Sequence, residues 1–523
     1  MDMMNDKAIS IKEQEIRDQA NALILAVNEG YQNGTGIHEL ERSLLDMVLK
    51  MGHQALGLLF ELCGEGDVGE SARLDDGREV NRLPSPHVKA YLSIFGPFEI
   101  SRFVYGTREG QKIEYVPLDA HLQLPRNKFS YLLQDWDQSL AVETPYLRVS
   151  ETLDRIFKLT VPVHSLERGN RELSGSTESY WKEQVASTEA EEDQIVVCSA
   201  DCKGVVIRKS AEEQAAYLQD EADNHKPASF EMNQPKKRSG KKKMAVVGAV
   251  YTVDPQERSP EQVLESLFRA PGEPSATDQP KRPAPVEKYI RASMERDKDD
   301  TLLPARTEIF NWLAQEQKQR NPSGEHQSVL IMDGEEALWV MGETCLAGAS
   351  TVEVLDLIHA CSYVWKAVQT LHPDEPVKYH VSIVKGYVGK ILNGGIHGVI
   401  RGLRWKATYN GLVGERRKQL EKACNYFENN VTRMRYDEYL AAGYPIASGV
   451  IEGACRHVVV DRMEGSGMRW VMGGAQSMLN LRCIRVSGHW DDFMIHHIQR
   501  EQNDIYPVKA ANDASFVALK LAG

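Results

Sequence analysis

The chain has 523 residues, of which 42% are hydrophobic, so it can form about three ordinary globular domains. No apolar run approaches the roughly 18 residues of a membrane span, and the acidic start Met1-Asp-Met-Met-Asn-Asp lacks a signal-peptide pattern, so we expect a cytoplasmic protein. The net charge of −13 disfavours a nucleic-acid partner, but residues 381–490 hold 16 Lys and Arg against 8 Asp and Glu, a local balance of +8 that is compatible with DNA.

The cysteines indicate neither a zinc knuckle nor a disulfide framework. All eight occur singly along the chain, with no Cys-x-x-Cys pair.

The first elements along the chain are predicted to be helices and then strands. Residues 8–66 carry apolar side chains at helical spacing. Two strands, Val88–Phe95 and Phe98–Tyr105, flank Gly96-Pro97, a pattern typical of a hairpin turn.

The segment 128–183 returns to helix in pieces. The helix Tyr146–Leu159 is followed by a short joint and then by Ser165, which can cap a second helix. That second helix carries Arg168 and Arg171. The pattern is compatible with a helix-turn-helix whose two arginines contact DNA, and equally with a plain helical hairpin.

Strands alternating with helices then predict an α/β core. The expected elements are the strands Gln194–Asp201, Gly204–Lys209, Met244–Val253 and Ser328–Asp333, the helix Thr307–Arg320, a strand leading into a helix over Thr351–Leu357, a helical stretch over 362–440 broken near Asn393, and the helix Val450–Met463. The resulting domains are 1–85 (helical), 86–127 (β-hairpin), 128–190 (helical, possible helix-turn-helix), 191–361 with 441–495 (α/β core), 362–440 (helical insertion) and 496–523 (C-terminal tail).

Three acidic residues in distant segments stand out from this pattern. Asp201 and Asp333 each end an apolar, β-branched run, and Glu452 lies in the first turn of a predicted helix. Three carboxylates that converge are what a two-metal phosphoryl-transfer site needs, because hard divalent cations prefer oxygen ligands. The sequence therefore predicts a metal site if the fold brings the three together.

Each of these residues also has an ordinary interpretation. Asp201 can be a turn residue, and Glu335 and Glu336, beside Asp333, suit a solvated helix start. Glu452 can stabilise a helix N-terminus or pair with Arg456 one turn on.

Two further motifs have open interpretations. His359 alone is more often a core histidine, but Asp356 three residues earlier makes it a plausible active-site neighbour. Arg469 and Trp470 suit a phosphate backbone and an unpaired base, and a buried tryptophan beside a surface arginine is the equal alternative.

Several motifs resemble the DDE transposases of bacterial insertion sequences, specifically the ISKra-type branch. They are Phe95-Gly-Pro-Phe-Glu-Ile-Ser-Arg, Pro117-Leu-Asp-Ala-His-Leu-Gln-Leu-Pro, Ser199-Ala-Asp-Cys-Lys-Gly, Asp333-Gly-Glu-Glu-Ala-Leu-Trp, Gly449-Val-Ile-Glu-Gly-Ala-Cys-Arg-His and Asp461-Arg-Met-Glu-Gly-Ser-Gly-Met-Arg-Trp. The resemblance implies a ribonuclease-H-like core with a mostly helical insertion, recognition of terminal inverted repeats, and metal-dependent DNA cleavage and strand transfer. Cys202 departs from the pattern, where a small residue, commonly Gly, is expected.

Carried over residue by residue, the resemblance makes Asp201, Asp333 and Glu452 the catalytic and metal-binding triad for two Mg²⁺, for which Mn²⁺ can substitute. It makes Asp356 and His359 active-site neighbours. Double-stranded DNA is then the expected partner of five residues: Arg168, Arg171, Arg456, Arg469 and Trp470. The expected assembly is a homodimer or higher homo-oligomer on DNA in the bacterial nucleoid.

Two other functions remain open. One is a catalytically silent DNA-binding protein derived from a transposase, and the other is a metal-dependent hydrolase of small phosphoesters.

Overall fold

The structure is a computed structural model that describes residues 2–74, 76–107, 113–183, 189–191, 194–208, 240–269, 282–296, 303–346, 348, 351–465 and 468–506. The chain forms two compact units. The first contains the residues up to Ser176 together with those from Trp490 on, and the second is Thr177–His489. None of the helices in these described ranges is both long and apolar enough to cross a membrane.

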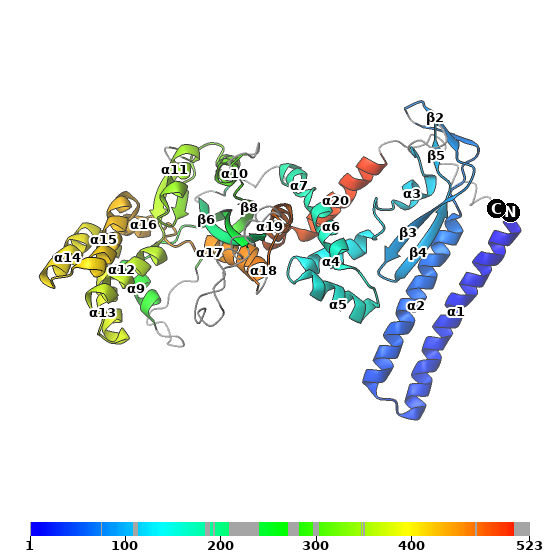
Figure 1. The fold of residues 1–523 in the computed structure, drawn as a ribbon, viewed down its shortest axis with the longest axis horizontal. Coiled ribbons are helices and arrows are strands. Elements are labelled where there is room, and N and C mark those ends of the chain that lie inside the picture. The colour runs from blue at the N-terminus through cyan, green and yellow to red at the C-terminus, as the bar shows by residue number, and fades with distance from the viewer. Residues whose placement is uncertain are drawn as a thin grey trace, which may run out of the picture. The chain divides into compact units, whose positions relative to one another are not determined.

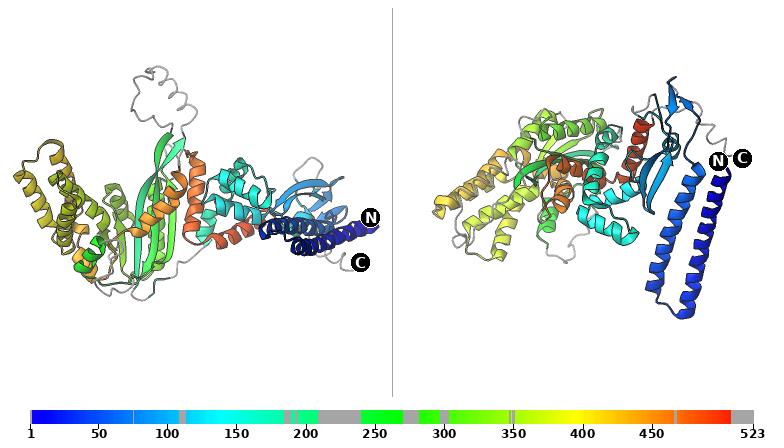
Figure 2. Two further views of the ribbon diagram at one scale, coloured as in Figure 1. Left: turned by 90° about the horizontal axis from the view of Figure 1, so that it is seen from below. Right: turned by 45° about the vertical axis from the view of Figure 1, so that its right-hand side comes forward.

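The first unit begins with two long helices and two small sheets. Helices α1 (Asp2–Asn33) and α2 (Ile37–Cys63) lie side by side (Figures 1 and 2). The expected helix over 8–66 is thus confirmed, with a break at Gly34, whose φ of 63° lies in the left-handed region. The strands are β1 (Ser71–Arg73), β2 (Glu79–Arg82) and β5 (Tyr105–Gly106) in one sheet, and β3 (His87–Ser93) with β4 (Gly96–Arg102) in the other.

The predicted hairpin exists, but its turn lies two residues earlier than expected. Ser93 pairs with Gly96, so the turn residues are Ile94 and Phe95, and Pro97 already lies opposite Leu92 in the ladder. Gly96 closes the turn with a φ of 120°, which a residue with a side chain rarely adopts.

Five helices complete the described part of the first unit: α3 (Pro117–Leu122), α4 (Tyr131–Ala141), α5 (Tyr146–Phe157), α6 (Val163–Ser174) and α20 (Trp490–Ile505). The helix expected at Tyr146 is confirmed. The expected cap at Ser165 is wrong, because α6 begins directly after Pro162 and Ser165 is buried in its first turn. Proline suits the start of a helix since its φ is already helical.

A buried histidine makes the stability of this unit depend on pH. His497 of α20 contacts Ser176, with 2.8 Å between Nδ1 and Oγ, and burial lowers the pKa of the imidazole from 6.5 to about 4. Between these two values the unfolded chain binds more protons than the folded chain, so stability falls as pH falls through this window, by up to about 3 kcal/mol. We expect thermal melting of a His497→Gln variant to depend less on pH between 7 and 4.5 than melting of the unchanged protein. Equal pH dependence of the two would contradict this assignment.

The second unit is built on a five-stranded mixed sheet in the order β10-β9-β6-β7-β8. Its strands are β6 (Ile195–Arg208), β7 (Gly240–Val253), β8 (Val286–Met294), β9 (Ser328–Met332) and β10 (Thr351–Leu355). Strands β6, β9 and β10 run parallel to one another, whereas β7 is antiparallel to both β6 and β8. The expected mixed α/β fold of the core is therefore confirmed.

The described helices of this unit are α7 (Thr177–Glu183), α9 (Pro260–Phe268), α10 (Ala305–Arg320), α11 (Glu336–Cys345), α12 (Leu357–Leu371), α13 (Val377–Leu392), α14 (Ile396–Tyr409), α15 (Gly414–Asn429), α16 (Tyr436–Ala441), α17 (Gly449–Cys455), α18 (Asp461–Met463) and α19 (Met472–Val486), with a short 3₁₀ turn at Val431–Arg433 and a π-helical turn at Arg456–Val460. The helical character of 362–440 and its break near Asn393 are confirmed, because α13 ends at Leu392 and α14 begins at Ile396.

The prediction of two strands around Asp201 is wrong. A single strand, β6, runs through Asp201, because β7 pairs with it without interruption from Ile195–Val253 to Arg208–Gly240. Asp201 therefore lies within a strand rather than at its end. Lys209, the expected end of the second strand, is outside the described residues.

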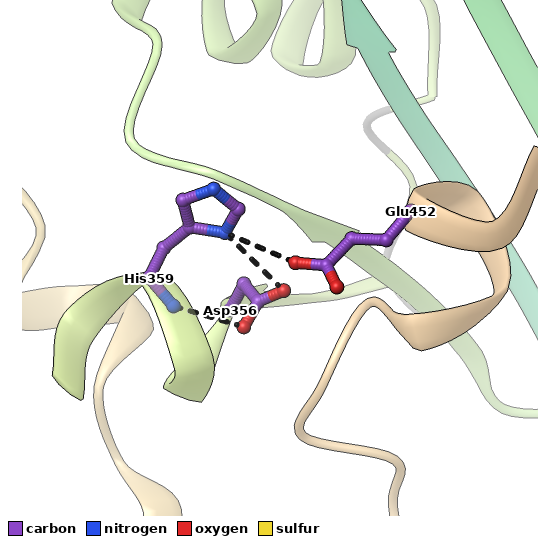
Figure 3. Close-up of side chains that lie close together, drawn as sticks. All are labelled: Asp356, His359 and Glu452. Carbon is purple, nitrogen blue, oxygen red and sulfur yellow. Dashed lines mark hydrogen bonds and ion pairs between the residues drawn. The ribbon is translucent and has the colours of Figure 1, made fainter. Parts of the chain in front are cut away.

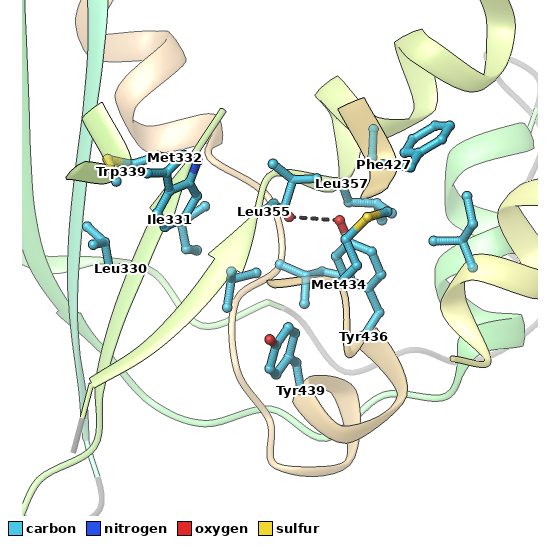
Figure 4. Close-up of a cluster of buried hydrophobic side chains, with 14 of the residues drawn as sticks. Leu330, Ile331, Met332, Trp339, Leu355, Leu357, Phe427, Met434, Tyr436 and Tyr439 are labelled. Atoms are coloured by element: carbon cyan, nitrogen blue, oxygen red, sulfur yellow. Dashed lines mark hydrogen bonds between the residues drawn. The ribbon is translucent and has the colours of Figure 1, made fainter. Parts of the chain in front are cut away.

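The helical segment between β10 and α17 shares one hydrophobic core with the sheet (Figure 4). In α16 the hydroxyl of Tyr436 donates to the carbonyl of Leu355 at 2.8 Å, and that of Tyr439 donates to the carbonyl of Glu353 at 2.9 Å. These bonds join the helices to β10, the edge strand of the sheet, so the segment supports the end of the sheet at which Asp333 and Asp356 lie.

Candidate metal centre

Three aspartates lie in one row across the parallel part of the sheet. Ser199 of β6 is in register with Ile331 of β9, which is in register with Val354 of β10. Two residues further along the chain come Asp201, which is still within β6, and Asp333 and Asp356, which directly follow β9 and β10. Because neighbouring strands lie about 4.8 Å apart, this register places the three aspartates next to one another.

A cluster of three possible metal ligands lies beside this row (Figure 3). Nδ1 of His359 is 3.5 Å from Oδ2 of Asp356 and 3.8 Å from Oε1 of Glu452. One ligand atom of each residue lies within 4.8 Å of the others, close enough to hold one metal ion. Within the described ranges no other such group is found, and the carboxyl groups of Asp201 and Asp333 are not members of this one.

Both carboxylate oxygens of Asp356 accept hydrogen bonds within the protein. Its Oδ1 caps α12 by accepting from the amides of Ile358 and His359 at 2.5 and 3.3 Å, and its Oδ2 accepts from the amide of Ser448 at 3.0 Å and from the Ser448 hydroxyl. A carboxylate has about four lone-pair sites, and four donors use them. Since Ser448 precedes α17, the fully buried Asp356 ties the start of α12 to the helix that carries Glu452.

The pKa values of the neighbouring groups connect Asp201, Asp333 and Glu452 to the same site. Burial raises the pKa of Asp333, and the charges of Asp201 and Asp356 raise it further. Burial also raises the pKa of Glu452, again with Asp356 and Asp201 adding to the effect. A site that disfavours its own negative charges in this way is one that a divalent cation would stabilise.

His359 responds to the same charges in the opposite direction. The carboxylate of Asp356, 3.5 Å from Nδ1 of His359, raises the pKa of the imidazole, and the charges of Asp333 and Glu452 contribute. A protonated His359 repels a cation, so it is better suited to orient Glu452 than to bind metal.

Two neighbours of Asp201 were not singled out from the sequence. Lys203 Nζ lies 3.6 Å from Oδ2 of Asp201, while Oδ1 accepts from the amide of Cys202 at 2.6 Å. On α17, burial raises the pKa of the Cys455 thiol, and the charge of Asp201 and a hydrogen bond to it raise that pKa further. Both could have been found by periodicity, because Lys203 follows Asp201 by two residues on a strand and Cys455 follows Glu452 by three on a helix.

The loop after β9 holds Asp333 through several contacts. Oδ1 of Asp333 accepts from the amide of Glu335 at 3.0 Å, and its backbone carbonyl accepts from the Trp339 indole at 2.6 Å. Glu335 pairs with Arg306 at 3.1 Å, whereas Glu336 is exposed on α11. The interpretation of Glu336 as a solvated helix start fits this position.

Gly334 allows the helical segment to approach Asp333 closely. A Cβ atom added there would overlap the ring of Tyr426 in α15, which stacks on Tyr363 with 3.7 Å between ring centroids. We expect Gly334→Ala to lower stability by about 1–3 kcal/mol, as overpacking does, which thermal melting would measure. Gly402→Ala in α14 is the control, because its added methyl meets no atom within 4 Å and should not lower the melting temperature. Similar melting temperatures for the two variants would contradict the close approach.

The residues expected at DNA are distributed over both units. In the first unit, Arg168 and Arg171 are exposed on α6, paired with Glu172 at 3.8 Å and Glu167 at 3.9 Å. In the second unit Arg456 pairs with Asp461 at 3.6 Å, so the alternative pairing of Arg456 with Glu452 is not seen.

Trp470 matches the alternative interpretation of its motif. It is 8% exposed, its indole donates to the carbonyl of Met463 at 3.2 Å, and the guanidinium of Arg462 lies over its ring. Its backbone is hydrogen-bonded to Val206 and Arg208 of β6, while the neighbouring Arg469 is exposed. Trp470 is thus a core residue whose ring is not accessible for base stacking.

No protein-family model matches this chain, and no curated protein is significantly similar to it.

Proposed function

We propose that the protein is a DNA transposase whose Asp201, Asp333 and Glu452 catalyse metal-dependent cleavage and strand transfer. The observation that carries this proposal is the row of aspartates on β6 and directly after the parallel strands β9 and β10, with Glu452 of α17 near them. These residues are far apart in sequence and belong to the motifs that resemble DDE transposases.

The order of the elements supports a ribonuclease-H-like core. In that fold the first Asp lies on the first strand and the second follows the fourth. In chain order, β6 is the first strand of this sheet and β9 is the fourth. Asp201 therefore lies on the first strand, and Asp333 follows the fourth. Glu452 comes after the helical segment, as the resemblance implies.

The chain's residues divide into those that would hold metal and those that position them. Asp201, Asp333 and Glu452 have carboxylate oxygens that suit two Mg²⁺ ions, which would polarise the attacked phosphate and lower the pKa of the attacking hydroxyl. Asp356 has no free lone pair and instead orients α17 through Ser448. His359 holds Glu452, and Lys203 balances the charge of Asp201.

The experiment uses the purified full chain and DNA that carries both flanks of its gene. Cleavage at the element ends is expected with Mg²⁺ or Mn²⁺ and is expected to stop with EDTA. Binding of the flanks without cleavage under any of these metals would favour the catalytically silent alternative. Cleavage of small phosphoesters but not of DNA would favour the hydrolase.

We also propose that the chain forms a homodimer through α2. Leu45, Val48, Ala55, Leu59 and Leu62 are all exposed, and with Gly52 between Val48 and Ala55 their spacing follows the alternating three- and four-residue steps of a coiled-coil seam. None of the described side chains of this 27-residue helix is buried, although such an apolar helix is usually covered.

Light scattering after gel filtration tests the dimer. The unchanged chain is expected at twice its monomer mass of 58.8 kDa, and Leu59→Glu with Leu62→Glu is expected at the monomer mass, because charge in the seam opposes packing. Lys50→Glu, a change at an exposed polar position of the same helix, is the control and should stay dimeric. A monomeric unchanged chain, or a dimeric double variant, would contradict the proposal.

A further inference from the structure

A small cavity of about 110 Å³ is lined in part by the residues that directly follow Asp356 and directly precede Ser448. Its walls come from the loop after β7, from α9, from the start of α12 and from the segment before α17. Leu357 and Ile358 follow Asp356, and Ala447 precedes Ser448, so the cavity adjoins the two residues that join α12 to α17. The volume is several times that needed for one water molecule and can take a tetrahedral anion.

Two arginines face this cavity without a carboxylate partner. Arg258 donates from Nε to the carbonyl of Gln256 at 3.2 Å and from Nη2 to the carbonyl of Tyr444. Arg282 donates from Nη2 to the hydroxyl of Ser266 at 3.1 Å. All these acceptors are neutral, and no ion pair of either arginine occurs among the described residues; Glu257 also lines the cavity and pairs with neither.

The two positive charges act against each other. Burial lowers the pKa of Arg258, and the charge of Arg282 lowers it further. Arg258 is half-buried and Arg282 is exposed. Neighbouring cations that repel each other and lack a counter-charge are stabilised when an anion binds between them, and guanidinium groups match phosphate oxygens in geometry. Phosphate is also the group that a DNA strand presents repeatedly along its backbone.

We propose that this cavity, the Arg258–Arg282 pocket, binds a backbone phosphate of the DNA strand close to the phosphate that is cleaved. The inference rests on the proposed function, because it takes DNA as the substrate of the candidate metal centre. It adds a subsite that positions the strand through Arg282 and Arg258, from elements that carry none of the three catalytic residues.

Chemical protection of Arg282 tests the pocket directly. The full chain is treated with phenylglyoxal, which modifies accessible guanidinium groups, in EDTA so that no cleavage occurs, and each arginine is followed by mass spectrometry. With duplex DNA at ten times its dissociation constant, modification of Arg282 is expected to slow about tenfold. The reason is that the DNA-free fraction of the protein falls by a factor of 1 + [L]/Kd, where [L] is the DNA concentration. Arg269 is the matched control, since it is exposed at the end of α9, outside the pocket, and should react at the same rate with and without DNA.

Inorganic phosphate is the second probe in the same assay. Protection by DNA, with or without protection by phosphate, supports the pocket as a strand subsite. Protection by phosphate alone identifies a small-anion pocket and overturns the proposal. It is also overturned if neither probe protects Arg282 while fluorescence anisotropy shows that the DNA is bound.

The variant Arg282→Gln provides an independent measurement. Loss of one phosphate contact should reduce the slope of log K against log salt by slightly less than one unit, whereas Arg269→Gln should leave it unchanged. Arg258 is left intact because it also holds the carbonyl of Tyr444. An unchanged slope for Arg282→Gln would overturn the subsite.

These readouts separate the pocket from the proposed function. If the chain binds DNA and protects Arg282 but never cleaves, the transposase proposal fails and the pocket stands. If it cleaves element ends while Arg282 stays unprotected, the pocket fails and the transposase stands. If it binds no DNA, both fail.

Discussion

Replacing Asp201 or Asp333 by Asn, or Glu452 by Gln, is expected to reduce Mg²⁺-dependent cleavage of element ends by about a thousandfold or more. Each amide keeps the shape of the side chain but removes one negative charge from the metal centre. Metal ions contribute several kcal/mol to stabilising phosphoryl-transfer transition states, and each 1.36 kcal/mol is about tenfold in rate. Initial cleavage rates on flanking DNA measure the effect, with DNA affinity measured beside them and expected to change little.

Folding and specificity need their own controls in this series. Burial raises the pKa of Asp333 and of Glu452, so the neutral amides should not lower the melting temperature. Glu336→Gln is the matched control, because it removes an exposed carboxylate three residues after Asp333. A folded Asp201, Asp333 or Glu452 amide that cleaves nearly as fast as the Glu336 variant would show that its carboxylate is not a metal ligand.

Asp356→Ala is expected to destabilise the second unit by about 3–5 kcal/mol, because it removes a helix cap and leaves buried donors of Ser448 without an acceptor. Thermal melting of the full chain, followed by a probe in this unit such as Trp339 fluorescence, measures the loss. Glu452→Ala removes the neighbouring carboxylate, which is 46% exposed, and should change melting far less.

Asp356 has two roles, the cap of α12 and the hydrogen bonds to Ser448 before α17. A double-mutant cycle of Asp356→Ala with Ser448→Ala separates the two contributions to stability. If Asp356 joins α12 to α17 through Ser448, the two substitutions together should cost clearly less than the sum of their separate costs. Additive effects, or an Asp356→Ala protein as stable as Glu452→Ala, would refute this positioning role. In that case Asp356 would become a candidate metal ligand in place of a structural residue.

Whether Asp356 is a structural residue or a metal ligand decides between two possible ligand sets that share Glu452. One set is Asp356, His359 and Glu452, and the other is Asp201, Asp333 and Glu452. The cluster of Asp356, His359 and Glu452 is the tightest group of possible ligands, yet four donors occupy Asp356 and the raised pKa of His359 favours its cationic form. Asp201 and Asp333 lie further from this cluster but have fewer hydrogen bonds to their carboxyl groups. This difference in free lone pairs favours the set that the resemblance implies.

The sequence by itself determined the type and approximate limits of most elements. Apolar runs located β9 and most of β7, because a strand covered on both faces needs apolar side chains throughout. Periodic apolar positions located α2, because helical spacing gathers apolar side chains on one face. The helices expected over Tyr146–Leu159 and Thr307–Arg320 correspond to α5 and α10. Such patterns reflect local requirements, which residues close in sequence satisfy.

Only the tertiary structure decided the length of β6, the register of the aspartates and the burial of Trp470. Strand β6 continues past Asp201 because β7, whose paired residues come 32 to 58 positions later in the chain, pairs along its whole length. Trp470 is buried because its backbone adds to the end of β6 and Arg462 covers its ring. The use of all four lone pairs of Asp356 depends on Ser448, 92 residues away. These features follow from hydrogen bonds and packing between distant segments, and a local pattern of residues does not contain the partner that completes them.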